Sequence, residues 1–397
     1  MATTLPAGLA FVELLHALPK LGAVLVPINT RLTSGERRWQ LEDCGARVVV
    51  EEPPEGEEAN VDLRVRVDAD AARTLIYTSG TSGLPKPVVL THGNHAASAM
   101  ASAWNLGVAP DDRWLCPLPL FHVGGLAVLL RSSLYGTAAI LHDGLDEEAA
   151  LKSLGSGEAT LVSLVPTMLR RLRAAGLEQA PALRAALLGG GPVPRDLLEW
   201  ARELGLPVLA TYGMTETASQ VATTPAGGGE GARILPGVEV RIGTAVLPYG
   251  ATVPSRRDTG EILVRGPMVA VGAVADNGWL HTGDRGHIDL EGLLHVDGRL
   301  KDVIVTGGEN VSAAEVEEAL LSHPAVQDAA VVGRPDAEWG EVVTGFVVLS
   351  ETAAEPADLI EHCRTRMAPF KVPKAIELVR GLPRNAAGKL VRSQLPR

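Results

Sequence analysis

Short apolar runs alternate with segments of helical periodicity along most of the chain. Residues 9–28 predict a helix, a turn and a strand, because Phe11, Leu15 and Leu18 have helical spacing before an apolar run begins. Residues 47–50 and 74–77 are short and largely apolar, as buried strands are. The opening of the chain therefore predicts mixed helix and strand.

Between residues 160 and 212 the alternation is regular. Strands are predicted at 160–165, 183–188 and 208–212, and helices that begin at Pro166 and Pro194 separate them. Such alternation is typical of a mainly parallel sheet, which binds ligands at the carboxyl ends of its strands. The predicted fold class is α/β, with a large N-terminal domain of mixed, mainly parallel sheets and helices.

The last part of the chain predicts a smaller α/β domain. Residues 223–260 look irregular, and a run of short strands follows them. Strands are then predicted at 328–332 and 345–349, with a helix near 357–367. Ser312, followed three residues later by a glutamate, predicts a capping box at the start of another helix.

The chain has 397 residues, of which 46% are hydrophobic and 21% are charged. This composition is ordinary for a globular enzyme, and the length allows more than one domain. We place the boundary so that residues 1–300 form the large domain and residues 301–397 form a small, mobile C-terminal domain.

Charge, apolar runs and cysteines narrow the function classes. The net charge of −11 argues against nucleic acid as the main partner, because phosphate contacts need a basic face. No apolar run is long enough to span a bilayer, so stable membrane insertion is not expected. Cys44, Cys116 and Cys363 are too widely spaced for a metal pattern or a disulfide framework, which favours a cytoplasmic protein.

One loop after the strand at 74–77 concentrates glycine and hydroxyl side chains and ends in a lysine. Glycine lets backbone N–H groups turn toward an anion, hydroxyls donate further hydrogen bonds, and lysine adds charge. The spacing is not that of a Walker A loop, and a polar surface turn is the simpler alternative. The candidate phosphate-binding residues are Thr78, Ser79, Gly80, Thr81, Ser82, Gly83 and Lys86.

Two further candidates stand beside apolar runs. His122 follows Pro-Leu-Phe at the end of a predicted strand, where a histidine is more often a packed core residue than a functional one. Arg131 lies within the apolar stretch 126–141. Its side chain either extends to the surface or lies in a pocket that binds an anionic substrate, since the planar guanidinium can form two hydrogen bonds with one carboxylate.

Two loops follow predicted strands of the parallel sheet. Gly189, Gly190, Gly191 and Pro192 allow the backbone to approach a flat base or a ribose closely. The other loop runs from Tyr212 and Gly213 through Thr215 to Glu216. Taken alone, Glu216 is a solvated loop acid more often than a ligand, but its carboxylate suits Mg²⁺, which takes oxygen ligands.

In order and content these motifs resemble those of the adenylate-forming enzymes, which include acyl-CoA synthetases, peptide-synthetase adenylation domains and luciferases. The resemblance covers roughly residues 9–392. Two features depart from the family pattern. Pro87 stands where the family usually has glycine, and the segment that normally precedes residues 21–29 is nearly absent, which suggests a misplaced start or a trimmed first subdomain.

The resemblance implies roles for the candidate residues. Tyr212 would stack on adenine and Thr215 would meet the α-phosphate, while Glu216 would hold Mg²⁺. His122 would lie at the acyl pocket with Gly189 and Arg131, and it would be catalytic together with Lys389 and Glu216. The resemblance also implies roles for motifs that carry little signal by themselves: Asp284 and Arg299 at the ribose, Lys301 as the hinge, Gly307 and Gly308 in the coenzyme A channel, and Lys389 as the adenylation lysine.

The implied activity is an AMP-forming acid–thiol ligase that uses ATP and coenzyme A as co-substrates. Within the family, Pro-Leu-Phe-His-x-x-Gly with a basic residue nine positions after the histidine resembles the o-succinylbenzoate–CoA ligases of menaquinone biosynthesis. The expected acid is therefore an aromatic dicarboxylate. No carrier segment follows Arg397, which favours free coenzyme A as the acceptor.

The sequence is also compatible with other functions. Another aryl or medium-chain acyl-CoA ligase would leave Arg131 with a structural role. A peptide-synthetase-like adenylation domain is a second alternative. A non-catalytic nucleotide- or acyl-binding remnant is a third, because of the short N-terminus. The oligomeric state is open as well, with a homodimer as one possibility.

Overall fold

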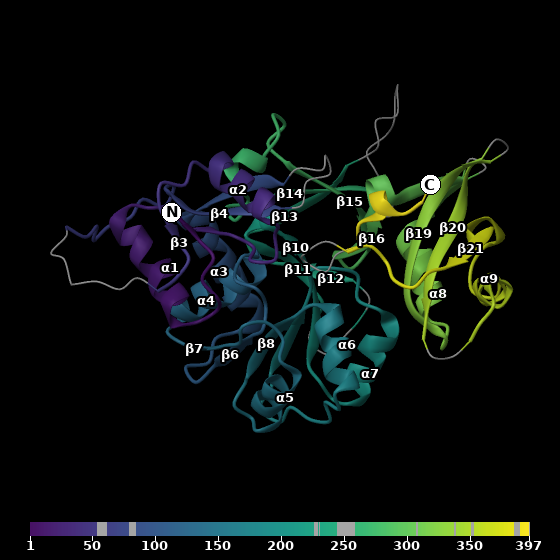
Figure 1. The fold of residues 1–397 in the computed structure, drawn as a ribbon, viewed down its shortest axis with the longest axis horizontal. Coiled ribbons are helices and arrows are strands. Elements are labelled where there is room, and N and C mark those ends of the chain that lie inside the picture. The colour runs from purple at the N-terminus through teal and green to yellow at the C-terminus, as the bar shows by residue number, and fades with distance from the viewer. Residues whose placement is uncertain are drawn as a thin grey trace. The chain divides into compact units, whose positions relative to one another are not determined.

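The computed structural model describes residues 1–53, 62–78, 85–225, 229, 231–243, 259–306, 309–336, 339–350, 353–384 and 390–396 (Figure 1). The chain forms two compact units. The first unit comprises Met1–Val193, Glu199–Arg241 and Leu263–His281. The second unit comprises Pro194–Leu198, Ile242–Ile262 and Thr282–Arg397. The predicted boundary at residue 300 falls inside the second unit, so the hinge there stays a prediction.

The first unit opens with three short parallel strands and two helices. These elements are β1 (Ala2–Thr3), α1 (Leu9–Leu21), β2 (Val26–Pro27), α2 (Ser34–Asp43) and β3 (Val49–Val50). Helix α1 ends where Gly22 adopts a left-handed conformation, with φ of +69°. Helix α2 begins with a capping box between Thr33 and Glu36.

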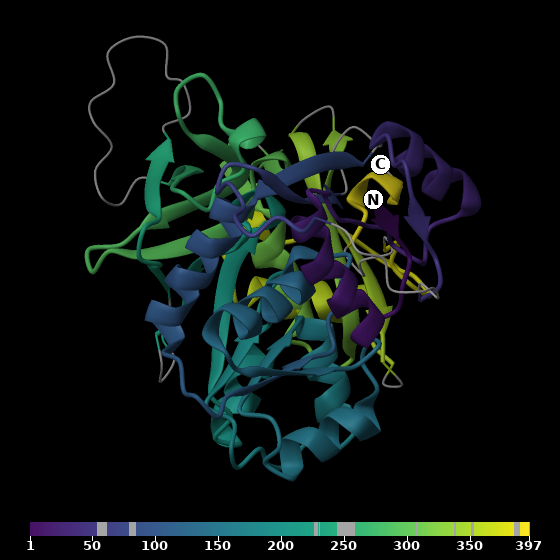
Figure 2. The same cartoon turned by 90° about the vertical axis from the view of Figure 1, so that its left-hand side faces the viewer.

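An antiparallel pair of strands follows, and two helices come after it. The elements are β4 (Ala72–Thr78), β5 (Lys86–Thr91), α3 (His92–Leu106) and α4 (Val123–Tyr135). Helix α3 starts directly from β5, with Thr91 and Asn94 as a capping box. Helices α3 and α4 pack against each other (Figure 2).

A parallel sheet forms the centre of the first unit, as the alternating pattern predicted. Its spatial order is β7-β6-β8-β9-β10. Every residue of β8 and β9 is buried, because strands covered on both faces carry continuous apolar runs. The strands and connecting helices are β6 (Arg113–Cys116), β7 (Ala138–Leu141), α5 (Glu147–Gly155), β8 (Leu161–Leu164), α6 (Pro166–Ala174), β9 (Ala185–Leu188), α7 (Arg195–Glu203) and β10 (Val208–Met214).

Antiparallel strands extend the pairing beyond β10. They are β11 (Ser219–Thr223), joined to β10 through the 3-10 turn η1 (Thr215–Thr217), and β12 (Ala232–Ile234). Next come β13 (Glu239–Gly243), β14 (Gly260–Arg265) and η2 (Val271–Ala273). The expectation that residues 223–260 are irregular is thus wrong for β12 and β13, whose few alternating residues are too short a pattern to detect.

The second unit is an α/β arrangement, which confirms the predicted fold class. A hairpin of β15 (Leu280–Ile288) and β16 (Leu293–Arg299) leads through η3 (Leu300–Asp302) to a sheet ordered β18-β17-β20-β19, with β21 parallel to β20. Helix α8 packs on β19 and α9 on β21 (Figure 1). The remaining bounds are β17 (Val303–Thr306), β18 (Glu309–Ser312), α8 (Ala313–Leu321), β19 (Val326–Asp336), β20 (Gly340–Leu349), α9 (Pro356–Arg364), η4 (Pro369–Lys371), β21 (Ala375–Leu378) and η5 (Arg392–Gln394).

Alternation along β19 divides the core of this sheet between its two faces. Ala329 and Val331 pack with the helices, whereas Ala330 and Val332 pack with Phe346 on the other face. The helix after β18 begins at the predicted place, but its capping box is wrong. The hydroxyl of Ser312 instead donates to the carbonyl of Asp297 at 2.8 Å.

Candidate active site

The predicted phosphate loop is closed at its base by β4 and β5. Thr78 and Lys86 face each other across the two strands, and the Thr78 hydroxyl donates to the Lys86 carbonyl at 3.3 Å. The hydroxyl of Tyr77 donates to Asp43 at 2.6 Å, which ties β4 to α2. Burial, reinforced by this hydrogen bond, raises the pKa of Tyr77. The predicted ligands between the strands, Ser79, Gly80, Thr81, Ser82 and Gly83, lie outside the described residues.

The glycine loop follows the carboxyl end of β9, as predicted. A Cβ atom on Gly189 would lie 2.8 Å from the Cγ2 atom of Thr211 on the neighbouring strand β10, so only glycine fits there. Gly190 has φ of +83°, and Gly191 faces open space. Gly190, Gly191 and Pro192 are exposed. This backbone can therefore be approached closely by a ligand.

The second predicted loop follows the carboxyl end of β10, next to the glycine loop. A β-bulge lies between Tyr212 and Gly213, where a Cβ on Gly213 would lie 1.7 Å from the carbonyl oxygen of Ser219. Thr215 and Glu216 occupy η1 and are partly buried. The parallel pairing of β9 with β10 thus brings the two predicted nucleotide loops to one edge of the sheet.

His122 is the residue immediately before α4. Its ring packs edge-on against Phe121, with 4.7 Å between the ring centroids, and its side chain is partly buried. The turn is tight, because a Cβ on Gly125 would lie 2.5 Å from the carbonyl oxygen of Pro119. His122 therefore lies at a helix start rather than deep in the core.

Arg131 is buried in α4, which overturns the alternative that it extends to the surface. Its residue is 3% exposed, and its guanidinium lies 5.8 Å from the centroid of the Trp114 ring. Nη2 donates to the Ser98 hydroxyl at 3.2 Å, while Nε is buried without a hydrogen bond among the described residues. No carboxylate in the described part of the chain pairs with it. Burial lowers the pKa of Arg131 to about 10, so the side chain remains a cation at neutral pH.

The second unit contains the predicted ribose residues. Nε of Arg299 lies 2.9 Å from Oδ1 of the buried Asp284, and its Nη1 donates to the Thr282 carbonyl at 3.2 Å. The backbone N–H of Asp284 also donates to the Thr282 hydroxyl at 3.0 Å, which fixes the main chain at this residue. Lys301 lies in η3, but its side chain is outside the described part of the structure.

Three other predicted residues are not described. Gly307, Gly308 and Lys389 fall in gaps of the described chain. The residues on either side of the Lys389 gap are placed, since Arg384 and Leu390 form an antiparallel bridge. Their functional assignments stay predictions.

Sequence reasoning missed the residues that surround Arg131. Ser98 and Trp114 precede it by 33 and 17 positions and belong to other elements, so no local spacing links them. The signal that could have found Ser98 is a row of small polar residues four apart along α3, at positions 94, 98 and 102.

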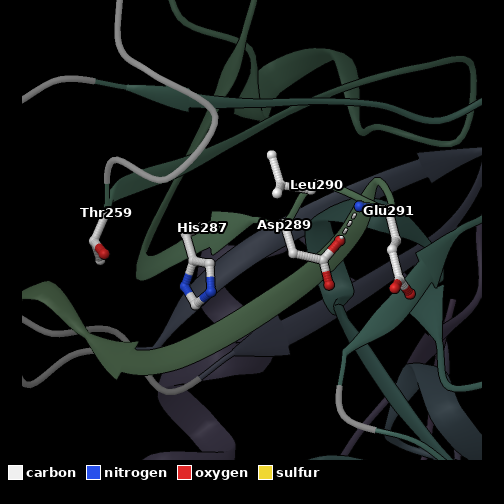
Figure 3. Close-up of a pocket in the computed structure, with 5 residues that line it drawn as sticks. All are labelled: Thr259, His287, Asp289, Leu290 and Glu291. Atoms are coloured by element: carbon white, nitrogen blue, oxygen red, sulfur yellow. Dashed lines mark hydrogen bonds between the residues drawn. The ribbon is translucent and has the colours of Figure 1, made fainter.

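A separate pocket of about 510 Å³ lies beside the β15–β16 turn and contains none of the predicted site residues. Thr259, His287, Asp289, Leu290 and Glu291 line it (Figure 3). Asp289 accepts hydrogen bonds from His295 at 2.8 Å and from the backbone of Glu291 at 2.9 Å, which lower its pKa. Asp289 thus stabilises the turn. Within the described ranges, no three His, Cys, Asp or Glu residues are arranged to hold a metal ion.

Comparisons with known proteins agree along almost the whole chain. The family profile "AMP-binding enzyme" matches residues 1–272, and "AMP-binding enzyme C-terminal domain" matches residues 315–389. A 2-succinylbenzoate–CoA ligase of Bacillus cereus is 41% identical over an alignment that covers all of this chain and 87% of the relative. One from Bacillus mycoides is also 41% identical, with the same coverage.

Solved structures give the same result. The o-succinylbenzoate CoA synthetase of Bacillus subtilis in complex with the acyl-adenylate intermediate OSB-AMP has a TM-score of 0.91 and 38% identity, covering 99% of this chain and 87% of the other. The same synthetase in complex with ATP and magnesium ion has a TM-score of 0.90 and 38% identity, covering 99% and 88%. Among the described residues, no helix is both long and apolar enough to cross a membrane.

Proposed function

Because this chain belongs to the AMP-binding enzyme family, we propose that it is an acid–thiol ligase that converts o-succinylbenzoate to o-succinylbenzoyl-CoA in menaquinone biosynthesis. The observation that carries the proposal is its likeness, over nearly the whole chain, to a solved synthetase bound to its acyl-adenylate. The curated relatives that carry the ligase name support the same acid.

The reaction has two steps. In the first, a carboxylate oxygen of the acid forms a bond to the α-phosphorus of ATP, and the bond to pyrophosphate breaks. In the second, the coenzyme A sulfur forms a bond to the acyl carbon, the thiol proton is lost, and AMP leaves. Neither step needs a covalent bond to the protein, so its residues act by positioning and by stabilising charge.

In the first step, the phosphate loop would hold the β- and γ-phosphates and Lys389 would stabilise the charge that develops at the α-phosphorus. Glu216 fits a magnesium site, because its partly buried carboxylate is a hard oxygen ligand on a well-anchored turn. When bound there, Mg²⁺ would withdraw charge from the leaving pyrophosphate. The loop ligands are Thr78, Ser79, Gly80, Thr81, Ser82, Gly83 and Lys86.

The family resemblance assigns nucleoside binding to several of the predicted residues. Tyr212 and the Gly189–Pro192 loop would face adenine, Thr215 would bind the α-phosphate, and Asp284 would accept hydrogen bonds from the ribose hydroxyls beside Arg299. Between the two steps, rotation about Lys301 would withdraw Lys389 and bring Gly307 and Gly308 to the thiol channel. Such a hinge would place the small C-terminal domain in one arrangement for adenylation and in another for thioester formation.

Arg131 would select the acid, with His122 and Gly189 lining the same pocket. A buried guanidinium without a carboxylate partner is costly, and a second substrate carboxylate would offset that cost through charge-assisted hydrogen bonds. A ligase for aryl or medium-chain monocarboxylates would not need this cation. That difference separates the proposal from its main alternative.

The test is formation of AMP that depends on both coenzyme A and Mg²⁺, with o-succinylbenzoate compared against benzoate, octanoate and cinnamate. A clear preference for o-succinylbenzoate is expected. Preference for a monocarboxylate would keep the ligase reaction and reject the acid. No AMP from any of the acids, with ATP binding intact by calorimetry, would favour a non-catalytic nucleotide-binding protein.

We further propose a cytoplasmic location and leave a homodimer as a hypothesis. Cys44, Cys116 and Cys363 are free thiols, as expected in a reducing compartment. Light scattering of the purified protein would give its mass in solution, and a mass of one chain would reject the homodimer.

A further inference from the structure

A row of buried polar side chains runs along one face of α3. Asn94, Ser98 and Ser102 are spaced four residues apart and are 5%, 4% and 0% exposed. Residues at this spacing lie on the same helix face. Burying such groups is costly unless they form hydrogen bonds. The first two do so, and each donates to main-chain carbonyls of the Glu216 turn or of a segment bonded to that turn.

Ser98 binds the main chain just after Glu216. Its hydroxyl donates to the Ala218 carbonyl at 2.8 Å and accepts from Nη2 of Arg131 at 3.2 Å. Arginine can only donate, so the Ser98 proton is left for Ala218. Ala218 and the next residue, Ser219, have φ of +49° and +119°. Such conformations cost non-glycine residues about 1–3 kcal/mol each and persist only where surrounding contacts enforce them.

Asn94 acts on Glu216 indirectly, through the segment 267–270. Its Oδ1 is used by the helix cap, where it accepts from the Thr91 backbone at 2.9 Å. Its Nδ2 donates to the carbonyls of Pro267 at 2.8 Å and Val269 at 3.0 Å. The N–H of the following residue, Ala270, donates to the Glu216 carbonyl at 2.8 Å. Asn94 therefore fixes the segment 267–270, and this segment in turn binds the main chain of Glu216.

We propose that Ser98 and Asn94 are positioning residues that keep the Thr215–Glu216 turn in the geometry required for the metal–nucleotide complex. Both act through the main chain. Helix α3 starts from β5, whose first residue is Lys86, so the same helix also connects this turn to the base of the phosphate loop. The inference rests on the proposed function, since it assigns a purpose to the position of Glu216.

The test compares Ser98→Ala with Ser102→Ala, a matched removal of a buried hydroxyl from the same helix. Ser102 makes no hydrogen bond to the Glu216 turn among the described residues. Ser98→Ala removes two buried hydrogen bonds, one to the Ala218 carbonyl and one from Arg131. We expect loss of the bond to Ala218 to lower kcat for AMP formation on the order of tenfold. The Mg²⁺ concentration at half-maximal rate should rise as well. Ser98→Thr, which retains the hydroxyl, should restore most of both.

Hydrogen–deuterium exchange without nucleotide gives a readout that needs no activity. The Ala218 amide, which donates to the Thr215 carbonyl at 3.0 Å, should exchange faster in Ser98→Ala than in Ser102→Ala. Equal exchange and equal Mg²⁺ dependence in the two variants would overturn the inference. If Ser98→Ala does not fold, Asn94→Asp decides, because it keeps the cap oxygen and removes both Nδ2 donors. A wild-type protein without AMP formation would reject the proposed function, while exchange would still test the turn.

Discussion

Nε of Arg299 lies 2.9 Å from Oδ1 of Asp284, and the two residues face each other across β15 and β16. The carboxylate is buried, whereas the arginine side chain is about half exposed (48%). The pair therefore presents an acceptor whose orientation depends on a neighbouring cation. This geometry suits recognition of two adjacent hydroxyl groups, as on a ribose.

Arg299→Gln should weaken ATP binding more than acid binding. Without the guanidinium, Asp284 loses a donor that helps to orient it, and we expect the KM for ATP to rise about tenfold, which corresponds to about 1.4 kcal/mol. Steady-state kinetics with each substrate varied in turn would measure this. Arg265→Gln is the control, because Arg265 also pairs with a cross-strand carboxylate, Glu239. Equal effects of the two variants on the KM for ATP would contradict the assignment.

Gly213→Ala should damage the Tyr212–Glu216 turn. The new Cβ would lie 1.7 Å from the Ser219 carbonyl oxygen, so the backbone of the bulge must move. Overpacking against backbone typically costs about 1–3 kcal/mol, and we expect a loss in this range in urea unfolding. Gly155→Ala in α5 is the control, because its Cβ meets nothing within 4 Å. Unchanged stability in Gly213→Ala would show that the bulge is not as described.

The parts of the fold that depend on neighbouring residues could be predicted from the sequence. Continuous apolar runs located β8, β9 and β10, and their parallel order placed the two nucleotide loops together. Contacts between distant segments were not predictable. Nothing near Ser98 indicates that its hydroxyl reaches Ala218, 120 residues later. The Ser312 hydroxyl likewise left its expected cap for the Asp297 carbonyl, a partner that exists only after the strands have packed.

His95 should make stability depend on pH. Its Nε2 lies 2.8 Å from the Thr74 hydroxyl, and burial, followed by the charges of Arg73, His92 and Arg131, lowers its pKa to about 3. An unfolded histidine has a pKa of about 6.5, so between these values the unfolded state binds the extra proton. Stability should therefore fall as the pH drops below about 6.5, by up to about 1.4 kcal/mol per pH unit.

His95→Gln would remove this contribution, because glutamine does not titrate and can still hydrogen-bond Thr74. Urea unfolding at several pH values between 4.5 and 8 would show a flatter dependence in the variant. The two proteins should be most alike at pH 8, where His95 is neutral in both states. An unchanged slope below pH 6.5 would mean that other groups cause the acid sensitivity.

Arg131→Leu should separate the two roles that the structure allows for this cation. If Arg131 binds the second carboxylate of o-succinylbenzoate, the KM for that acid should rise about 10–100-fold, because a hydrogen bond to a charged group contributes about 1.5–3 kcal/mol. The KM for ATP and the rate with benzoate should then change little. Arg173→Leu is the control for loss of a guanidinium over an indole, since the exposed Arg173 lies 5.4 Å from the Trp200 centroid in another helix. If Arg131 serves only to orient Ser98, Arg131→Leu should instead reduce kcat for every acid alike and reproduce the Mg²⁺ dependence of Ser98→Ala. That second outcome would remove Arg131 from the acid pocket and leave the choice of dicarboxylate to other residues.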